Sequence, residues 1–362
     1  MVVTFVPRAL AAALIVVALL SPAATAASAP KPDPCRNRTE LFTQHIIDPA
    51  AVSGVAPVGG QTGSGGVLAV RSYVFPKQEL RGKRLAIRAP AAMTLFGASY
   101  YLPPGAPAGY KPEYSLYFSA PCSLEVKFFH IKGISSRLGT VVPKAPSASS
   151  ASQRVKPLPV AAGEQIGWYE PAVGSVAFDF WVDDLAKQNS FISPKRYAQS
   201  NARYAVCPWQ FYAKPLRSVW MAKLGDQGGL ARPGTSCGVV TQGTRGSVLG
   251  QWFREPNVNL PVVDRLTMDG SYQSQAMVTM ESSGSVRLGG FYAPQALIVG
   301  RTGSTAAGWS DPRTITAGTT RCFSDGNRAV HLTLQSATTL RATVTPSCSS
   351  AVPTNEWRTY YR

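Results

Sequence analysis

Two side chains on predicted strands have the clearest potential for chemistry. The segment "FFHI" (128–131) carries His130, and the apolar segment "AFDFWV" (177–182) carries Asp179. A carboxylate close to a histidine favours the charged imidazolium and raises the pKa of the ring. If the two strands are neighbours, we expect an ion pair or a hydrogen bond, so His130 and Asp179 form the candidate site.

A hydrolytic zinc ion needs about three protein ligands and an open position for water, whose pKa the metal lowers towards 7. The chain has three histidines, His45, His130 and His331, and no CxxC pair. A zinc site would therefore require the fold to bring His45 or His331 to His130 and Asp179. We expect each isolated histidine to be structural, and we expect no metal or other cofactor.

Four segments must position the candidate site. In chain order they are "IRAPAAMTLFG" (87–97), "FFHIKGIS" (128–135), "VAAGEQIG" (160–167) and "AFDFWV" (177–182). In this order they resemble the lysostaphin-type metalloendopeptidases, whose fold is the duplicated hybrid motif. The "AGEQIG" turn alone is also similar to lipoyl and biotinyl carriers, so the order of all four segments carries the resemblance.

The resemblance also shows which ligands the chain lacks. In that family a His-x-x-x-Asp pair and the second histidine of the last strand bind zinc. Here the two histidine positions of the last strand hold Ala177 and Asp179, and residues 60–84 contain neither His nor Asp. His130 matches the remaining family histidine. The resemblance thus implies a vestigial site and a pseudoenzyme; the alternative is a zinc metalloendopeptidase that cleaves peptidoglycan with rearranged ligands.

Aromatic residues near the candidate site offer a different use. Four of them lie in or directly after the last two of these four segments: Trp168, Tyr169, Phe178 and Trp181. Aromatic faces can stack on sugar rings, so these four residues are candidates for lining a binding groove. The competing interpretation is that they fill the hydrophobic core.

The charge of the chain indicates the chemistry of a partner. The formal net charge is +17, with 36 Lys and Arg against 19 Asp and Glu. Such an excess favours an anionic cell-wall or envelope polymer, although solubility alone could also explain it. An envelope protein is a second partner class, and a structural or adhesive module is a third interpretation. Because the chain carries an export signal, we do not expect nucleic acid to be the partner.

The first 27 residues have the pattern of a secretory signal peptide. Arg8 precedes the apolar run "ALAAALIVVALL" (9–20), and Ala24-Thr25-Ala26 supplies small residues before a cleavage point. The run is shorter than the roughly 20 residues that a spanning helix needs. We expect a protein that is secreted or held in the cell envelope, with no stable membrane span once the signal is removed; a retained anchor is the alternative.

The cysteine count fits that location. Six cysteines in an exported chain predict three disulfides. They are Cys35, Cys122, Cys207, Cys237, Cys322 and Cys348. We expect Cys322 to pair with Cys348 across a C-terminal hairpin, and we consider Cys122–Cys207 and Cys35–Cys237 for the other two bonds.

Short alternating segments separated by Gly- and Pro-rich turns predict an all-β protein. After the signal peptide (1–27), residues 28–66 are expected to be irregular. Residues 67–225 are expected to form the peptidase-like β domain, a barrel-sandwich of the duplicated hybrid motif. Residues 235–362 are expected to form a smaller C-terminal β-barrel or sandwich, which includes a hairpin of "VHLTL" and "TLRATV".

Overall fold

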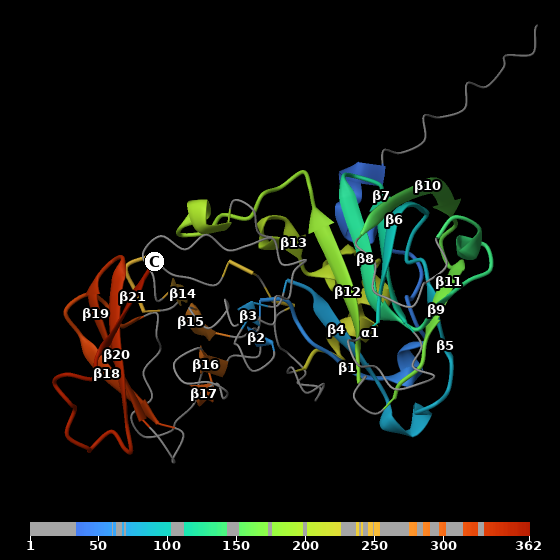
Figure 1. Ribbon diagram of the computed structural model, residues 1–362. Coiled ribbons are helices and arrows are strands. Elements are labelled where there is room, and N and C mark those ends of the chain that lie inside the picture. Colours follow the sequence, from blue (N-terminus) through green and yellow to red (C-terminus); the bar gives the residue numbers. More distant parts are fainter. Residues whose placement is uncertain are drawn as a thin grey trace, which may run out of the picture. The chain divides into compact units, whose positions relative to one another are not determined.

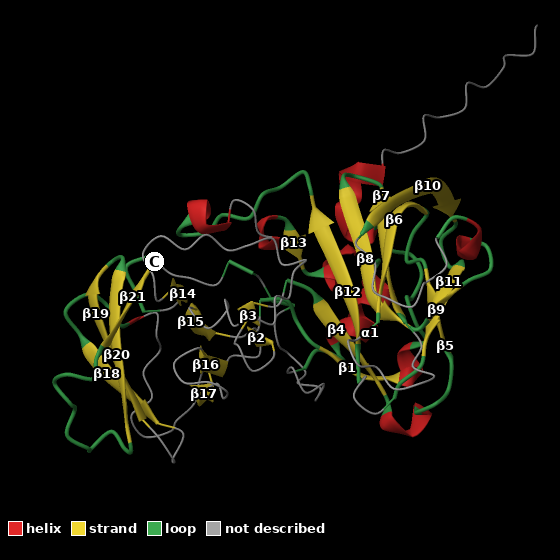
Figure 2. Ribbon diagram, in the orientation of Figure 1, coloured by secondary structure: helices red, strands yellow, loops and turns green. Residues whose placement is uncertain are grey.

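The computed structural model describes seventeen stretches of the chain (Figures 1 and 2). The described residues are 34–59, 61–62, 67–68, 70–102, 112–142, 152–172, 176–197, 201–225, 237–238, 240–241, 245–248, 250–253, 275–280, 285–289, 297–301, 314–324 and 329–362. The all-β class is confirmed, because strands in antiparallel sheets dominate these residues. None of the sheets in the described stretches closes into a barrel, so of the expected barrel or sandwich arrangements a closed barrel is not formed there. The predicted signal peptide (1–27) lies outside the described residues.

The largest sheet of the first part of the chain positions the candidate site. Its central path, in spatial order, is β1 (Val52–Val55), β4 (Ser72–Pro76), β12 (Phe178–Asp184), β8 (Leu124–Ile131), β7 (Glu113–Ala120), β6 (Met93–Tyr101) and β10 (Gln153–Val160). β13 (Ala205–Val206) also pairs with β12. All neighbours are antiparallel. The strands that carry His130 (β8) and Asp179 (β12) are direct neighbours (Figure 1).

A second sheet contributes to the same hydrophobic core. It has the order β5 (Leu85–Arg88), β11 (Gln165–Tyr169) and β9 (Gly133–Ile134). Alternation sends Ile87 and Ile166 of this sheet inward, where both are fully buried. From the large sheet, Phe128 and Phe180 stack in that core with ring centroids 5.3 Å apart. The two sheets therefore bury their apolar faces together.

The N-terminal segment is more ordered than the irregular stretch expected at 28–66. Residues 34–59 contain η1 (Pro34–Glu40), η2 (Pro49–Ala51) and β1. Phe42 is fully buried and forms a bridge with Tyr212. The segment joins the core because its isolated apolar residues dock on distant aromatic rings, a contact that local periodicity does not reveal.

Short helices make the remaining connections of the first part. They are η3 (Gln78–Leu80), η4 (Leu138–Thr140), η5 (Pro194–Tyr197), η6 (Asn201–Arg203), η7 (Pro208–Phe211) and α1 (Lys214–Met221). Two two-residue strands, β2 (Gln61–Thr62) and β3 (Val67–Leu68), pair with each other. Trp220 of α1 and Trp209 of η7 stack with centroids 4.7 Å apart, which fixes this end of the segment on the core.

The C-terminal part forms one antiparallel sheet with a core of its own. Its spatial order is β17 (Leu297–Arg301), β16 (Ser285–Gly289), β15 (Gln275–Met280), β14 (Gly250–Phe253), β21 (Arg358–Tyr361), β20 (Thr339–Thr345), β19 (Ala329–Ser336) and β18 (Thr320–Ser324). The predicted hairpin is confirmed as β19 and β20, and Ser336 pairs with Thr339 across a two-residue turn.

Three disulfides are present, and all six cysteines are used. The predicted Cys322–Cys348 bond is confirmed. The predicted Cys122–Cys207 and Cys35–Cys237 bonds are wrong; the structure pairs Cys35 with Cys122 and Cys207 with Cys237. The prediction failed because pairing depends on which Cα atoms come within about 7 Å, and only the packing of η1 and η7 decides that. A search of the described residues finds no helix with the length and apolar character needed to cross a membrane.

Candidate functional site

A β-bulge presents His130 to the candidate site. Leu116 of β7 pairs with Phe128, but Tyr114 pairs with Ile131, so Ser115 faces two residues of β8. Strict alternation would send His130 to the core side with Phe128. The extra residue instead places the imidazole on the opposite face, beside Asp179. His130 has a positive φ of 65°, a conformation that is uncommon for a residue with a side chain and is often found beside functional groups.

Four charged side chains surround this histidine. His130 Nδ1 lies 2.5 Å from Glu113 Oε2, and His130 Nε2 lies 3.7 Å from Asp179 Oδ2. Lys132 Nζ donates to Glu113 Oε1. Arg71 Nε lies 2.9 Å from Asp179 Oδ2, as an ion pair rather than a well-aligned hydrogen bond. The cluster thus holds two carboxylates and three cationic groups.

Burial differs sharply within this cluster. The Asp179 side chain is 0% exposed, the Glu113 side chain 8%, and the His130 side chain 41%. Asp179 sits on β12 between Phe178 and Phe180, which point to the core, so its carboxylate occupies the other face of the strand. The imidazole is therefore the part of the cluster that solvent reaches most easily.

The neighbouring carboxylates favour the protonated form of the histidine. Burial opposes this, but the charge of Asp179 and the contact with Glu113 raise the pKa of His130, against a smaller opposing effect of Arg71. Burial alone would raise the pKa of Glu113, yet hydrogen bonds and charges from His130 and Lys132 lower it to about 2. These effects together favour an imidazolium bound to a carboxylate.

This protonation state limits what the site can do. A zinc ligand or a general base must offer a lone pair on a neutral imidazole. Both ring nitrogens of His130 already face carboxylates. Within the described stretches, no group of three or more His, Cys, Asp and Glu side chains has an arrangement that could hold a metal ion. With His130 protonated, the cluster carries three positive and two negative charges.

The other two histidines have different neighbours. His45 packs against aromatic rings, with centroids 5.6 Å from Trp220 and 6.4 Å from Tyr212, and burial lowers its pKa. His331 is on β19, where its Nε2 lies 3.0 Å from Thr345 Oγ1. The described contacts of His130 therefore come from carboxylates and not from a second imidazole.

Three of the four aromatic candidates belong to the core. Tyr169, Phe178 and Trp181 are at most 1% exposed, and Tyr169 packs on Phe178 with centroids 5.3 Å apart. They cannot stack on a ligand in this conformation, because their rings are packed against other residues of the core. Trp168 on β11 is the exception: it is half-buried, and the Arg84 guanidinium lies 5.1 Å from its ring centroid.

Sequence reasoning did not find Glu113, Lys132 or Arg71. Lys132 follows His130 by two residues, and Glu113 opens the alternating strand "EYSLYFSA" on its polar phase. These local signals mark the two residues as polar neighbours of predicted strands. They do not show that β7, β8 and β12 are neighbours or that β8 is bulged, and the cluster depends on both facts.

Comparisons with protein-family models, with curated proteins and with solved structures give no match for this chain. The function must therefore be argued from the cluster, the charge and the exposed side chains.

Proposed function

We propose that this chain is an exported binding protein with a peptidase-like β domain that does not hydrolyse its ligand, and that the ligand is an anionic polymer of the cell envelope. The observation that carries the proposal is the pairing of His130 with Glu113 and Asp179. Both ring nitrogens of His130 face carboxylates, which favours the charged form of the ring and leaves no lone pair directed at a zinc ion, so binding suits the site better than metal-assisted hydrolysis.

A basic segment beside Trp168 supports an anionic ligand. Residues 77–88, which run through η3 and β5, contain five basic residues and the single acid Glu79. Arg81, Lys83 and Arg84 are exposed. Because β5 pairs with β11, the segment carries Arg84 to the ring of Trp168. Arg84 lies over the Trp168 ring, so positive charge and an aromatic side chain occur together where a polymer with charged groups and sugar rings could contact them.

Co-sedimentation tests this proposal. The purified mature protein is mixed with insoluble wall fragments that carry anionic polymer, and the bound fraction is measured as salt increases. We expect binding that weakens as salt screens the charges. The variant Arg81→Glu/Lys83→Glu should lower the affinity about tenfold, since it reverses two exposed charges at the proposed surface.

The matched control is Arg321→Glu/Arg358→Glu, which makes the same change in net charge at exposed positions of the C-terminal sheet. This control should bind within about twofold of the unaltered protein, because its charges lie outside the basic segment. Equal losses in the two variants would show attraction by net charge alone and contradict the assigned surface. Release of soluble fragments from peptidoglycan, abolished by a chelator, would instead support the zinc metalloendopeptidase.

A further inference from the structure

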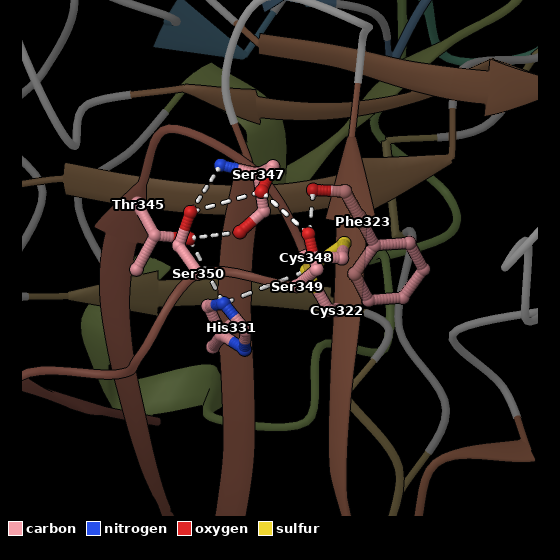
Figure 3. Close-up of a disulfide and its surroundings, with 8 residues drawn as sticks. All are labelled: Cys322, Phe323, His331, Thr345, Ser347, Cys348, Ser349 and Ser350. Carbon is pink, nitrogen blue, oxygen red and sulfur yellow. Dashed lines mark hydrogen bonds between the residues drawn. A yellow bond between two sulfur atoms is a disulfide. The ribbon is translucent and has the colours of Figure 1, made fainter.

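The disulfide of the C-terminal sheet has a histidine at one of its two sulfurs (Figure 3). Cys322 of β18 pairs directly with His331 of β19, and His331 pairs with Thr343 of β20. His331 Nε2 lies 3.6 Å from Cys322 Sγ. The side chain of His331 points away from the apolar core of this sheet, towards the turn that contains Cys348.

Hydrogen bonds decide which nitrogen of His331 carries the proton. The hydroxyl of Thr345 donates its only proton to the Ser347 carbonyl at 2.7 Å. Its oxygen can therefore only accept from His331 Nε2, at 3.0 Å. Burial lowers the pKa of His331, so the ring is neutral at pH 7 and its one proton is on Nε2. The same N–H is within reach of Cys322 Sγ.

The two sulfurs differ in access. Cys348 is exposed in a turn in which Ser347 and Ser350 hydrogen-bond to each other, whereas Cys322 is half-buried on its strand. Cys207 is only 4% exposed, and the remaining cysteines are half-buried. An attacking thiolate must approach a sulfur in line with the S–S bond, so Cys348 is the most accessible point of attack.

We propose that the Cys322–Cys348 bond is a site of thiol–disulfide exchange, in which an external dithiol attacks Cys348 Sγ and Cys322 is the leaving thiolate stabilised by the His331 Nε2–H. The first step forms a mixed disulfide at Cys348 and breaks the bond to Cys322, which keeps the electron pair. The second thiol of the dithiol then attacks the first dithiol sulfur, which is bonded to Cys348 Sγ, and forms a disulfide within the dithiol. Cys348 leaves as a thiolate, and both thiolates take protons from solvent.

The direction of this exchange follows from the leaving group. Exchange is faster when the leaving thiol has a lower pKa, and a hydrogen bond to the thiolate lowers that pKa. His331 supplies this bond to Cys322 at the buried end, while the exposed end is free for the attacking thiol. The net result is reduction of one disulfide in the protein and oxidation of the dithiol.

Glutathione mapping on the unaltered protein tests the direction. The oxidised full-length protein is exposed briefly to the monothiol glutathione, the reaction is quenched with acid, and the modified cysteines are identified by peptide mass spectrometry. We expect glutathione on Cys348 at a level about fivefold or more above Cys322. Modification mainly at Cys322, or earlier modification of the other four cysteines, would overturn the proposal.

A variant tests the role of His331. We expect His331→Phe, which keeps a ring and removes the N–H, to slow the opening of Cys322–Cys348 by dithiothreitol about tenfold. The opening of Cys35–Cys122 in the same sample is the internal control. In the control variant Thr333→Val, two residues along the same strand, the Cys322–Cys348 bond should open at the same rate as in the unaltered protein. Equal rates in His331→Phe and the unaltered protein refute the proposal; if His331→Phe does not fold, the glutathione mapping decides.

Discussion

At the scale of single residues, His130 combines a strained backbone with a well-satisfied side chain. A residue with a Cβ at φ 65° costs of order 1–3 kcal/mol, so it persists only where its surroundings compensate for that cost. The contacts with Glu113 and Asp179 contribute to that compensation. The bulge and the ion pairs therefore act together: the bulge turns the ring out of the core, and the carboxylates favour its charged form.

This arrangement makes stability depend on pH. Because the folded protein raises the pKa of His130, its stabilising effect is fully present below the unfolded pKa of 6.5 and is lost as pH rises through the higher folded value. The difference in unfolding free energy between the unaltered protein and His130→Gln should therefore shrink from pH 6 to pH 9. Urea denaturation across this range measures it, and taking the difference cancels the contributions of His45 and His331.

A pH-independent difference would contradict an imidazolium at this position. The size of the effect at pH 6 should be modest, because the side chain is 41% exposed and water screens part of its charge.

At the scale of elements, two glycines explain the turn "AGEQIG". Gly163 has φ 80°, a conformation that favours glycine, and Glu164 accepts from the Ala161 N–H within the same turn. Gly167 lies where β11 passes close to β9: a Cβ there would be 2.4 Å from the Gly133 carbonyl oxygen. The small residues of this segment are therefore needed for a turn and for close strand packing.

The close approach predicts a clear difference between two similar substitutions. Gly167→Ala should lower the unfolding free energy by about 1–3 kcal/mol, because the methyl group forces backbone apart. Gly139→Ala, in η4, is the matched control, since a Cβ there meets nothing within 4 Å. Denaturant titration of both variants is the measurement. Equal stabilities would mean that β9 and β11 are farther apart than described.

At the scale of the whole molecule, disulfides and charge are the properties that suit an exported binding protein. The Cys35–Cys122 bond joins η1 to the turn between β7 and β8 across 87 residues. It fastens the N-terminal segment to the sheet that carries His130. The same molecule has a formal net charge of +17, which supports an anionic partner for the proposed surface around Trp168.

Loop length predicts the relative effect of the first two disulfides. Removing Cys35–Cys122 with a double alanine variant should cost about 4 kcal/mol of unfolding free energy, since it frees a long loop in the unfolded chain. Removing Cys207–Cys237, which spans 30 residues, should cost about 1 kcal/mol less. Tryptophan fluorescence in denaturant titrations reports both, and the reverse order would contradict this account.

The edge strand β10 shows where sequence patterns fail. Gln153–Val160 ("QRVKPLPV") pairs with β6, although its prolines and charged residues interrupt the strand alternation. Prolines and charged residues at an edge strand limit pairing with other chains, and they also remove the alternation by which strands are recognised. The hairpin of β19 and β20 was predicted correctly, because both of its strands alternate and its turn is local.

The amino-acid sequence by itself determined the all-β class, the six-cysteine framework and the hairpin, and it suggested His130 and Asp179 as one candidate site. These follow from alternation, composition and motifs, which act over a few residues. Only the tertiary structure decided the partners of Cys35 and Cys207, the burial of Trp181 and the convergence of Glu113 on His130. Each depends on strand order and on a one-residue bulge, and a shift of one residue exchanges the two faces of a strand.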